Sequence, residues 1–372
     1  MIQETVPNVS KNQQQRPARA PSLEKLQNFW YVACLSESLR KEPLSRTIVD
    51  HPIVLFRDPQ GRAHALLDRC CHRDLPLSFG KITARGIQCG YHGWEFSTAG
   101  QCVRIPGKLP QDSTLPRSNV PAFPVVEQDG LIWVFPAQDR EPLNRPLPIP
   151  FHEDPTYGTL LLDFGPVKAS VENALDNFMD SLHTPFVHPG LIYNDRKRNA
   201  LEIAVRPYLH PDGHAGVEGC YLGEPAPTQG LIGRIFADGS TDAMIHEERF
   251  IAPTLSQVEF RIGVTSHLLS TQVLTPETQT CTRLYLVLRV KSKIPKFLTT
   301  FLFRLLLTRL LRQDIRVLEQ QQAALESVGD SPRVSSELDL LSLTTIHFFH
   351  QLAEGKAQDN IVIKPRRYAV YI

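Results

Sequence analysis

Residues 68–96 read DRCCHRDLPLSFGKITARGIQCGYHGWEF and indicate how the first third of the chain is built. This stretch contains Cys70-x-His72 and, after sixteen intervening residues, Cys89-x-x-His92. Each Cys–His pair is expected in a loop. Two adjacent loops of this kind can bring four ligand side chains to one metal centre. The sequence therefore predicts a metal-stabilised domain.

Zinc and iron–sulfur centres both accept two cysteines and two histidines. Structural zinc sites usually begin with Cys-x2-4-Cys and often end with His-x3-5-His, and neither pair here has that form. The mixed order fits a Rieske 2Fe-2S cluster, in which two thiolates hold one iron and two imidazoles hold the other. Cys71 adjoins His72, but residues two apart face the same side of an extended loop, so Cys70 is the predicted ligand. The predicted cluster ligands are Cys70, His72, Cys89 and His92.

Short apolar strands with turn residues between them surround this stretch, over residues 28–136. That pattern predicts a small all-β domain. Residues 137–155 are rich in proline and have little periodicity, which is typical of a linker. We place the domain boundary near Arg145. The predicted organisation is a disordered tail at 1–24, a 2Fe-2S domain at 25–145 and a second domain at 146–372.

A second group of candidate ligands begins with VENALDNFMDSLH, residues 171–183. Its apolar residues recur at spacings of three and four, which predicts an amphipathic helix that ends before Pro185. On such a helix Asp180 and His183 project from one face. His188 follows after a turn. Two histidines and a carboxylate form the ligand set of non-haem Fe(II) oxygenases, although a histidine pair alone can also be a core feature.

The third iron ligand is expected from a distant helix. In LLRQDIRVLEQQQAALE, Asp314 lies between apolar residues of a helix that would otherwise bury leucine and valine. Asp314 is therefore the predicted carboxylate, with Glu319 as the alternative. The other histidines, such as His246 and His267, have no ligand spacing and are predicted to be structural.

The C-terminal domain combines strands with long helices. Residues 200–292 alternate as antiparallel strands, whereas residues 295–327 and 336–353 have helical composition. The predicted fold class is α+β, with an all-β domain followed by a domain of antiparallel sheet and long C-terminal helices.

Three segments resemble the Rieske domain of the Rieske-type non-haem iron oxygenases over residues 28–136. The segments are CCHRDLPLSFGKI (70–82), CGYHGWEFSTAGQC (89–102) and FPVVEQDGLIWVFP (123–136). Gly90 stands where the family usually has proline, and Asp74 stands where glycine is common. The similarity leans toward the branch of vanillate O-demethylase, pheophorbide a oxygenase and chlorophyllide a oxygenase.

The segment Asp180-x-x-His183-x4-His188 is similar to the mononuclear iron motif of the same family. The resemblance implies a catalytic domain of helix-grip fold, in which His183, His188 and Asp314 hold Fe(II) and Asn177 lies near the iron. It also implies a head-to-tail homotrimer. In that trimer Asp180 links a cluster histidine of one subunit, for which we favour His92, to an iron histidine of the next.

This resemblance implies a terminal oxygenase that uses O2 to hydroxylate or demethylate an apolar substrate, aromatic or polycyclic. Electrons would come from a separate ferredoxin or flavin reductase, because the chain has no G-x-G-x-x-G fingerprint for a flavin or nicotinamide. Two alternatives stay open from the residues: a Rieske electron-transfer protein without oxygenase activity, and a zinc-stabilised binding module.

Composition excludes other classes of protein. The chain has 372 residues and a formal net charge of +1, which disfavours a nucleic-acid-binding function. Seven scattered cysteines do not suggest a disulfide framework, and the polar N-terminus lacks a secretory signal, so we expect a cytoplasmic protein. The basic, apolar residues 297–316 favour a core helix with a solvated face over a helix on a membrane surface.

Overall fold

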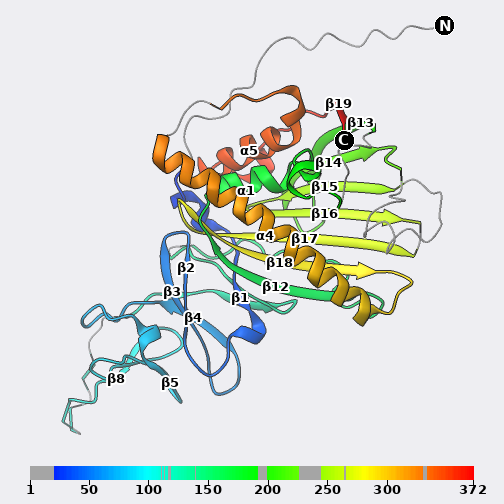
Figure 1. Ribbon diagram of the computed structural model, residues 1–372. Helices are drawn as coiled ribbons and strands as arrows, with labels where there is room; N and C mark the ends of the chain where they lie inside the picture. The colour runs from blue at the N-terminus through cyan, green and yellow to red at the C-terminus, as the bar shows by residue number, and fades with distance from the viewer. Residues whose placement is uncertain are drawn as a thin grey trace, which may run out of the picture.

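The computed structural model describes residues 21–372 except 110, 113, 116–118, 139, 192–198, 226–243, 264 and 330–332. Its strands form three small sheets in the N-terminal part and one eight-stranded sheet in the C-terminal part. Figure 1 shows the small sheets at one end of the molecule and helices across one face of the large sheet. The predicted tail at residues 1–24 lies largely outside the described residues.

The three N-terminal sheets are antiparallel and match the predicted all-β domain. The first joins β1 (Tyr31–Leu35), β11 (Leu131–Val134) and β10 (Val125–Gln128). The second joins β2 (Leu44–Ile48), β3 (His51–Arg57), β4 (Ala63–Leu67) and β9 (Ala122–Phe123). The third joins β5 (Lys81–Thr83), β6 (Gly86–Gln88), β7 (Glu95–Phe96) and β8 (Cys102–Arg104).

Two loops of this domain carry the predicted cluster ligands. One loop connects β4 to β5, and the other joins β6 to β7. Both loops rest on a small apolar core that also contains two of the predicted ligands. Its fully buried members include Val54, Phe56, Leu66, Cys70, Leu77, Ile87, Cys89 and Phe96. The core fixes the base of each loop and leaves the rest of the loop near the surface.

The large antiparallel sheet has the order β12-β18-β17-β16-β15-β14-β13-β19. Its strands are β12 (Gly158–Val167), β13 (Ala200–Leu209), β14 (Ala215–Leu222), β15 (Ile245–Ile251), β16 (Leu255–Ile262), β17 (Ser266–Thr278), β18 (Cys281–Lys291) and β19 (Arg366–Tyr371). The strands at 200–292 were predicted from their alternation. With the long helices they confirm the predicted α+β class.

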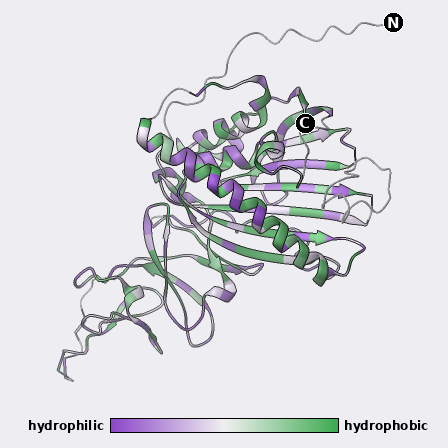
Figure 2. Cartoon of the chain, viewed as in Figure 1, coloured by the Kyte–Doolittle hydropathy of each residue, from purple (hydrophilic) through white to green (hydrophobic). Residues whose placement is uncertain are grey.

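The helices pack against one face of this sheet. They are α1 (Val171–Phe178), α2 (Thr184–Val187), α4 (Lys296–Val328) and α5 (Leu340–Ala353). Leucines and Phe303 of α4 are buried against residues of β16, β17 and β18. Figure 2 shows that α4 is apolar in its N-terminal half and hydrophilic in its C-terminal half. Within the described residues, none of the helices has both the length and the hydropathy to cross a membrane.

The prediction of one helix over residues 171–183 is wrong. Helix α1 ends at Phe178, and a separate single turn, α2, starts at Thr184. The chain leaves the helix because the Asp180 carboxylate accepts a hydrogen bond from the backbone N–H of Leu182 at 2.8 Å. An aspartate that bonds the backbone two residues on favours a turn over a helix. Asp180 and His183 therefore lie in a connecting loop and do not share a helical face.

The N-terminal sheets contact the large sheet at its strands β17 and β18. The Tyr285 hydroxyl donates to the backbone carbonyl of Ala33 at 2.6 Å, and the Thr275 hydroxyl donates to that of Val32 at 2.7 Å. One continuous apolar core contains residues from both parts of the chain. The domain boundary near Arg145 stays a prediction. It falls between β11 and β12, where the described residues form no helix or strand.

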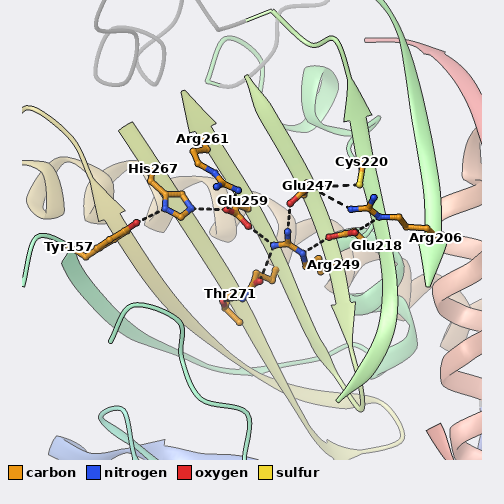
Figure 3. Close-up of polar contacts among 11 residues, drawn as sticks. Tyr157, Arg206, Glu218, Cys220, Glu247, Arg249, Glu259, Arg261, His267 and Thr271 are labelled. Atoms are coloured by element: carbon orange, nitrogen blue, oxygen red, sulfur yellow. Dashed lines mark hydrogen bonds and ion pairs between the residues drawn. The ribbon is translucent and has the colours of Figure 1, made fainter. Parts of the chain in front are cut away.

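The face of the sheet away from α4 carries a network of charged side chains (Figure 3). Arg249 at its centre contacts carboxylates on three strands: Glu218 at 2.6 Å, Glu259 at 2.5 Å, and Glu247. Arg206 extends the network to β13, and His267 extends it to Tyr157. Successive side chains of a strand point to opposite faces of the sheet. The residues that precede and follow each member of this network therefore face the helices.

Candidate metal centres and the adjoining pocket

The first candidate centre is formed by the loops that follow β4 and β6. The side chains of Cys70 and Cys89 are 1% and 3% exposed, whereas Cys71 is exposed. Cys70 donates its backbone N–H to Leu75, and Cys89 donates its own to Trp94, so both loops curl around a cysteine. Burial raises the pKa of the Cys70 thiol to about 11, and the neighbouring Cys89 contributes to that rise. Both thiols lie inside the same small apolar core of the domain.

The two imidazoles lie side by side on the outer part of the same loops. The rings of His72 and His92 are 4.6 Å apart between centroids, and His72 stacks on Trp94 at 4.5 Å. His92 is exposed and packs on Tyr91 at 3.9 Å. The structure thus brings the thiols together in the core and the imidazoles together near the surface. A Rieske cluster, with one iron held by each pair, requires this arrangement.

A single zinc ion fits these four residues less well. A tetrahedral site with bonds of about 2.0–2.3 Å needs ligand atoms within roughly 4 Å of one another. Among the described residues, no three of the four side chains bring their ligand atoms within 4.8 Å of each other. The residues present fit a two-iron cluster.

The second candidate centre joins the α1–α2 segment to the middle of α4. Ligand atoms of His183, His188 and Asp314 lie within 4.8 Å of one another. Asp314 Oδ1 is 2.9 Å from His188 Nε2 and 3.4 Å from His183 Nε2. His188 and Asp314 are 0% and 1% exposed. Glu319, the alternative carboxylate, instead accepts a hydrogen bond from the backbone of Lys168 at 3.4 Å.

Local structure orients each of these ligands. His183 precedes α2 and His188 follows it, and the His188 N–H is bonded to the carbonyl of Thr184. The Nδ1 atom of His188 lies 3.0 Å from Gln313 Oε1, which can accept a hydrogen bond from Nδ1–H and so leaves Nε2 turned toward Asp314. The Asp180 carboxylate lies 3.6 Å from Nδ1 of His183.

The electrostatics of this cluster suit a cation. Burial lowers the pKa of His183, but the carboxylates of Asp180 and Asp314 outweigh burial and raise it to about 10. Burial also opposes ionisation of Asp314, yet the two imidazoles hold its pKa below the usual value. His188 Nε2 and Asp314 Oδ1 are buried and have no hydrogen-bond partner despite their proximity. Two imidazoles and one carboxylate with unsatisfied buried atoms fit a divalent iron.

A cavity of about 140 Å³ opens beside the second centre. Leucines and Phe303 of α4 form one wall, and Val258, Phe260 and Ile262 of β16 form another. Asn177, which was predicted to lie near the iron, lines the cavity together with Phe178 and Asp180. The Asn177 Oδ1 atom is buried without a hydrogen-bond partner. The second centre therefore adjoins an apolar chamber large enough for a small ring compound.

Two protein-family models match the two parts of the chain. Residues 29–124 match the Rieske 2Fe-2S domain. Residues 167–354, just over half of the chain, match the vanillate O-demethylase oxygenase C-terminal domain. The chain belongs to the Rieske-type non-haem iron oxygenases.

Individual relatives of this Rieske oxygenase lie in the predicted branch. The oxygenase component of dicamba O-demethylase from Stenotrophomonas maltophilia is 44% identical over 167 residues, which cover 44% of this chain and 48% of the relative. Chlorophyllide a oxygenase from Chlamydomonas reinhardtii is 38% identical over 168 residues, or 44% of this chain and 25% of the relative. The matched residues thus span about half or less of these relatives.

A solved structure extends the likeness to the whole fold. Dicamba monooxygenase bound to dicamba superposes with a TM-score of 0.72 at 28% identity. The match covers 90% of this chain and 98% of that chain.

The structure gives a physical account of the two departures from the family pattern. Asp74 adopts a positive φ of 59°, the left-handed conformation that usually favours glycine, and pairs with Arg69 at 2.7 Å. A Cβ atom on Gly90 would lie 2.8 Å from the carbonyl oxygen of Phe79. The close approach of residue 79 therefore requires glycine at position 90 in this Rieske oxygenase.

Several cavity residues were not predicted from the sequence. Glu224, His246, Glu248, Ser270 and Gln272 line the same cavity. His246 was interpreted as structural, but it faces the pocket. The alternation on residues 245–251 was the available signal, because His246 and Glu248 are polar at positions that share one strand face.

Proposed function

We propose that this chain is a terminal oxygenase component that uses O2 to hydroxylate or demethylate a small, mostly apolar substrate. The observation that carries this proposal is the buried cluster of His183, His188 and Asp314, which opens on an apolar cavity. A chain that only transferred electrons would need no second metal centre beside a cavity. The name of the dicamba O-demethylase relative favours demethylation among the oxygenase reactions.

We assign the inner iron of the Rieske cluster to Cys70 and Cys89, and the outer iron to His72 and His92. Burial of the thiols shields the inner pair from solvent, while the exposed His92 presents the outer pair to a partner. Imidazole in place of thiolate reduces the ligand charge, which raises the reduction potential relative to an all-cysteine cluster.

We assign the mononuclear iron to His183, His188 and Asp314. Ferrous iron held by these three residues would supply redox chemistry and a place for O2 to bind. The protein's part is positional. Gln313 fixes the His188 ring, and Asp180 lies against His183. The apolar wall of α4 excludes water from the reacting end of the substrate.

Electron delivery is proposed to involve other chains. A separate ferredoxin or flavin reductase would reduce the cluster, since the chain has no nucleotide fingerprint. Within a homotrimer, Asp180 would accept a hydrogen bond from His92 of the neighbouring subunit. The Asp180 side chain is 35% exposed, so it is open to such a partner.

Two measurements on anaerobically purified protein test this function. Metal analysis is expected to give about three irons per chain, two for the cluster and one for the mononuclear site. Replacing His183 by alanine is expected to abolish turnover and leave the cluster spectrum unchanged. Zinc in place of iron would support a binding module. Two irons per chain in the wild type, with no further loss of iron in the His183 variant, would support an electron-transfer protein.

A further inference from the structure

The cavity wall formed by the large sheet carries a polar group that the proposed reaction does not use. Strand register aligns Tyr221, His246, Phe260 and Leu268 in one row across β14 to β17. The next row contains Gly219, Glu248, Val258 and Ser270. Successive rows on one face of a sheet are neighbours. His246 and Glu248 are therefore adjacent on this wall.

His246 is held rigidly in this wall. Its ring is stacked between Tyr221, at 3.8 Å, and Phe260, at 4.3 Å. Nδ1 of His246 lies 2.7 Å from Glu224, and Nε2 lies 3.5 Å from Oε1 of Glu248. Burial lowers the pKa of His246, but the carboxylates of Glu224 and Glu248 outweigh burial and raise it to about 9. Two carboxylates thus share one imidazolium, and Glu224 makes the closer contact.

Glu248 is left without a full complement of partners. Its side chain is 6% exposed, and the Oε2 atom is buried with no hydrogen-bond partner. Oε1 of Gln272, on the same cavity wall, is also a buried acceptor without a donor. Both unsatisfied atoms accept hydrogen bonds, and neither can donate one. Oε2 of Glu248 and Oε1 of Gln272 are therefore acceptors without donors on the cavity wall.

The charged residues of the cavity wall also indicate a place for a cation. Among the described residues that line the cavity there is no lysine or arginine. Arg249 follows Glu248 in the sequence but lies on the opposite face of the strand, where it pairs with Glu218, Glu247 and Glu259 (Figure 3). Glu224 and Glu248 place two buried carboxylates around the one imidazolium of His246, and the excess negative charge is unfavourable until a second cation arrives.

We propose that Glu248 is the substrate-recognition group of this pocket and that it selects a compact, mostly apolar molecule bearing a protonated amine. The proposal rests on the proposed function and adds the chemical class of its substrate. An ammonium group supplies both the positive charge and the N–H donors that Glu248 and Gln272 lack. The size of the described cavity suits one aromatic ring, since an apolar cavity of about 150 Å³ holds benzene.

Binding to the wild-type protein, loaded with both metal centres, tests the proposal directly. Three probes share one ring and one methyl ether and carry a cationic, a neutral or an anionic group opposite the ether: 4-methoxybenzylamine, 4-methoxybenzyl alcohol and 4-methoxybenzoate. Calorimetry is expected to give at least about tenfold tighter binding of the amine than of the alcohol, with the benzoate weakest. Equal affinities, tighter binding of the benzoate, or no binding of the amine at millimolar concentration would overturn it.

A pair of variants on one strand identifies the residue responsible. Glu248→Gln keeps the shape and removes the charge, and is expected to weaken amine binding about tenfold with little change for the alcohol. Glu247→Gln makes the same change on the opposite face and is expected to leave both affinities unchanged. A Glu248→Gln variant that keeps the amine preference would overturn the assignment, and the wild-type probe series decides should that variant fail to fold.

Formaldehyde release from the three methyl ethers, measured with O2 and with electrons from a surrogate ferredoxin and its reductase, separates this proposal from the proposed function. Amine-selective binding without any turnover would leave the recognition group intact and contradict the oxygenase. Turnover with preference for the benzoate would support the oxygenase and contradict the role of Glu248.

Discussion

Among single residues, Asp314 is expected to have the largest effect on the second metal centre. Its buried carboxylate is the group that approaches both imidazoles. Replacing Asp314 by alanine removes the one negative ligand, so the iron content should fall by about one per chain and turnover should be lost. The visible spectrum of the cluster should not change. Metal analysis and absorption spectra of the purified variant measure both.

Glu319 offers a matched control on the same helix. Its carboxylate contacts the backbone of Lys168 and not the imidazoles. Glu319→Gln is therefore expected to retain the full iron content. The assignment fails if Asp314→Ala keeps its iron while Glu319→Gln loses it.

Glu259 makes the stability of the protein dependent on acid pH. Burial raises the pKa of Glu259, but hydrogen bonds from His267 and Arg249 outweigh burial and lower it to about 2. A lowered pKa gives stability that is present above the unfolded value of about 4.3 and is lost as pH falls toward 2. The stability difference between wild type and Glu259→Gln should therefore shrink by about 2 kcal/mol from about pH 5 to about pH 3.

Equilibrium unfolding in urea at several pH values measures this difference. Glu202→Gln serves as the control, because the Glu202–Arg367 pair is exposed and should contribute little. A difference between wild type and Glu259→Gln that does not vary with pH would contradict the assignment.

At the scale of elements, the charged network holds β13 to β17 together on the face away from α4. Arg249 is 11% exposed and neutralises carboxylates on β14, β15 and β16. Arg249→Met leaves these carboxylates buried without their cation, which is expected to cost about 3–5 kcal/mol of unfolding free energy. Arg367→Met, at an exposed pair, should cost less than about 1 kcal/mol. Urea midpoints of the two variants test the contrast, and similar losses would contradict it.

Elements with a strong local pattern could be predicted from the sequence, and elements set by side-chain competition could not. The long helix α4 and the strands at 200–292 follow from composition and alternation. The break after Phe178 depends on one hydrogen bond from Leu182 to the Asp180 carboxylate, which periodicity does not reveal.

Some residues of the candidate site could also be predicted from the sequence, and others could not. Cys70, His72, Cys89 and His92 are close in sequence, so their spacing carried the prediction. Glu248 and His246 face the cavity only because α4 covers that side of the sheet and the register of four strands aligns them. The sequence near these two residues shows only that polar side chains recur at every second position, which does not reveal the cavity.

At the scale of the whole molecule, the two centres lie apart within one chain. Figure 1 shows the β5–β8 sheet, whose loops carry the cluster ligands, at the end of the molecule away from α1 and α5. His92 is exposed there, and Asp180 is partly exposed beside His183. Electrons that pass between subunits would connect the cluster of one chain to the iron of the next. This route predicts that activity depends on assembly.

Mixed assemblies test the route. A His183→Ala subunit retains a cluster but no mononuclear iron, and a His92→Ala subunit retains the iron but no cluster. Each is expected to be inactive alone. In randomly mixed head-to-tail trimers about one interface in four places an intact cluster next to an intact iron, so co-expression should restore up to roughly a quarter of wild-type turnover. Two different affinity tags, purified in sequence, isolate the mixed trimers, in which about one interface in three is intact. An inactive mixed trimer that holds the cluster in one kind of subunit and the mononuclear iron in the other would show that electrons travel within a chain.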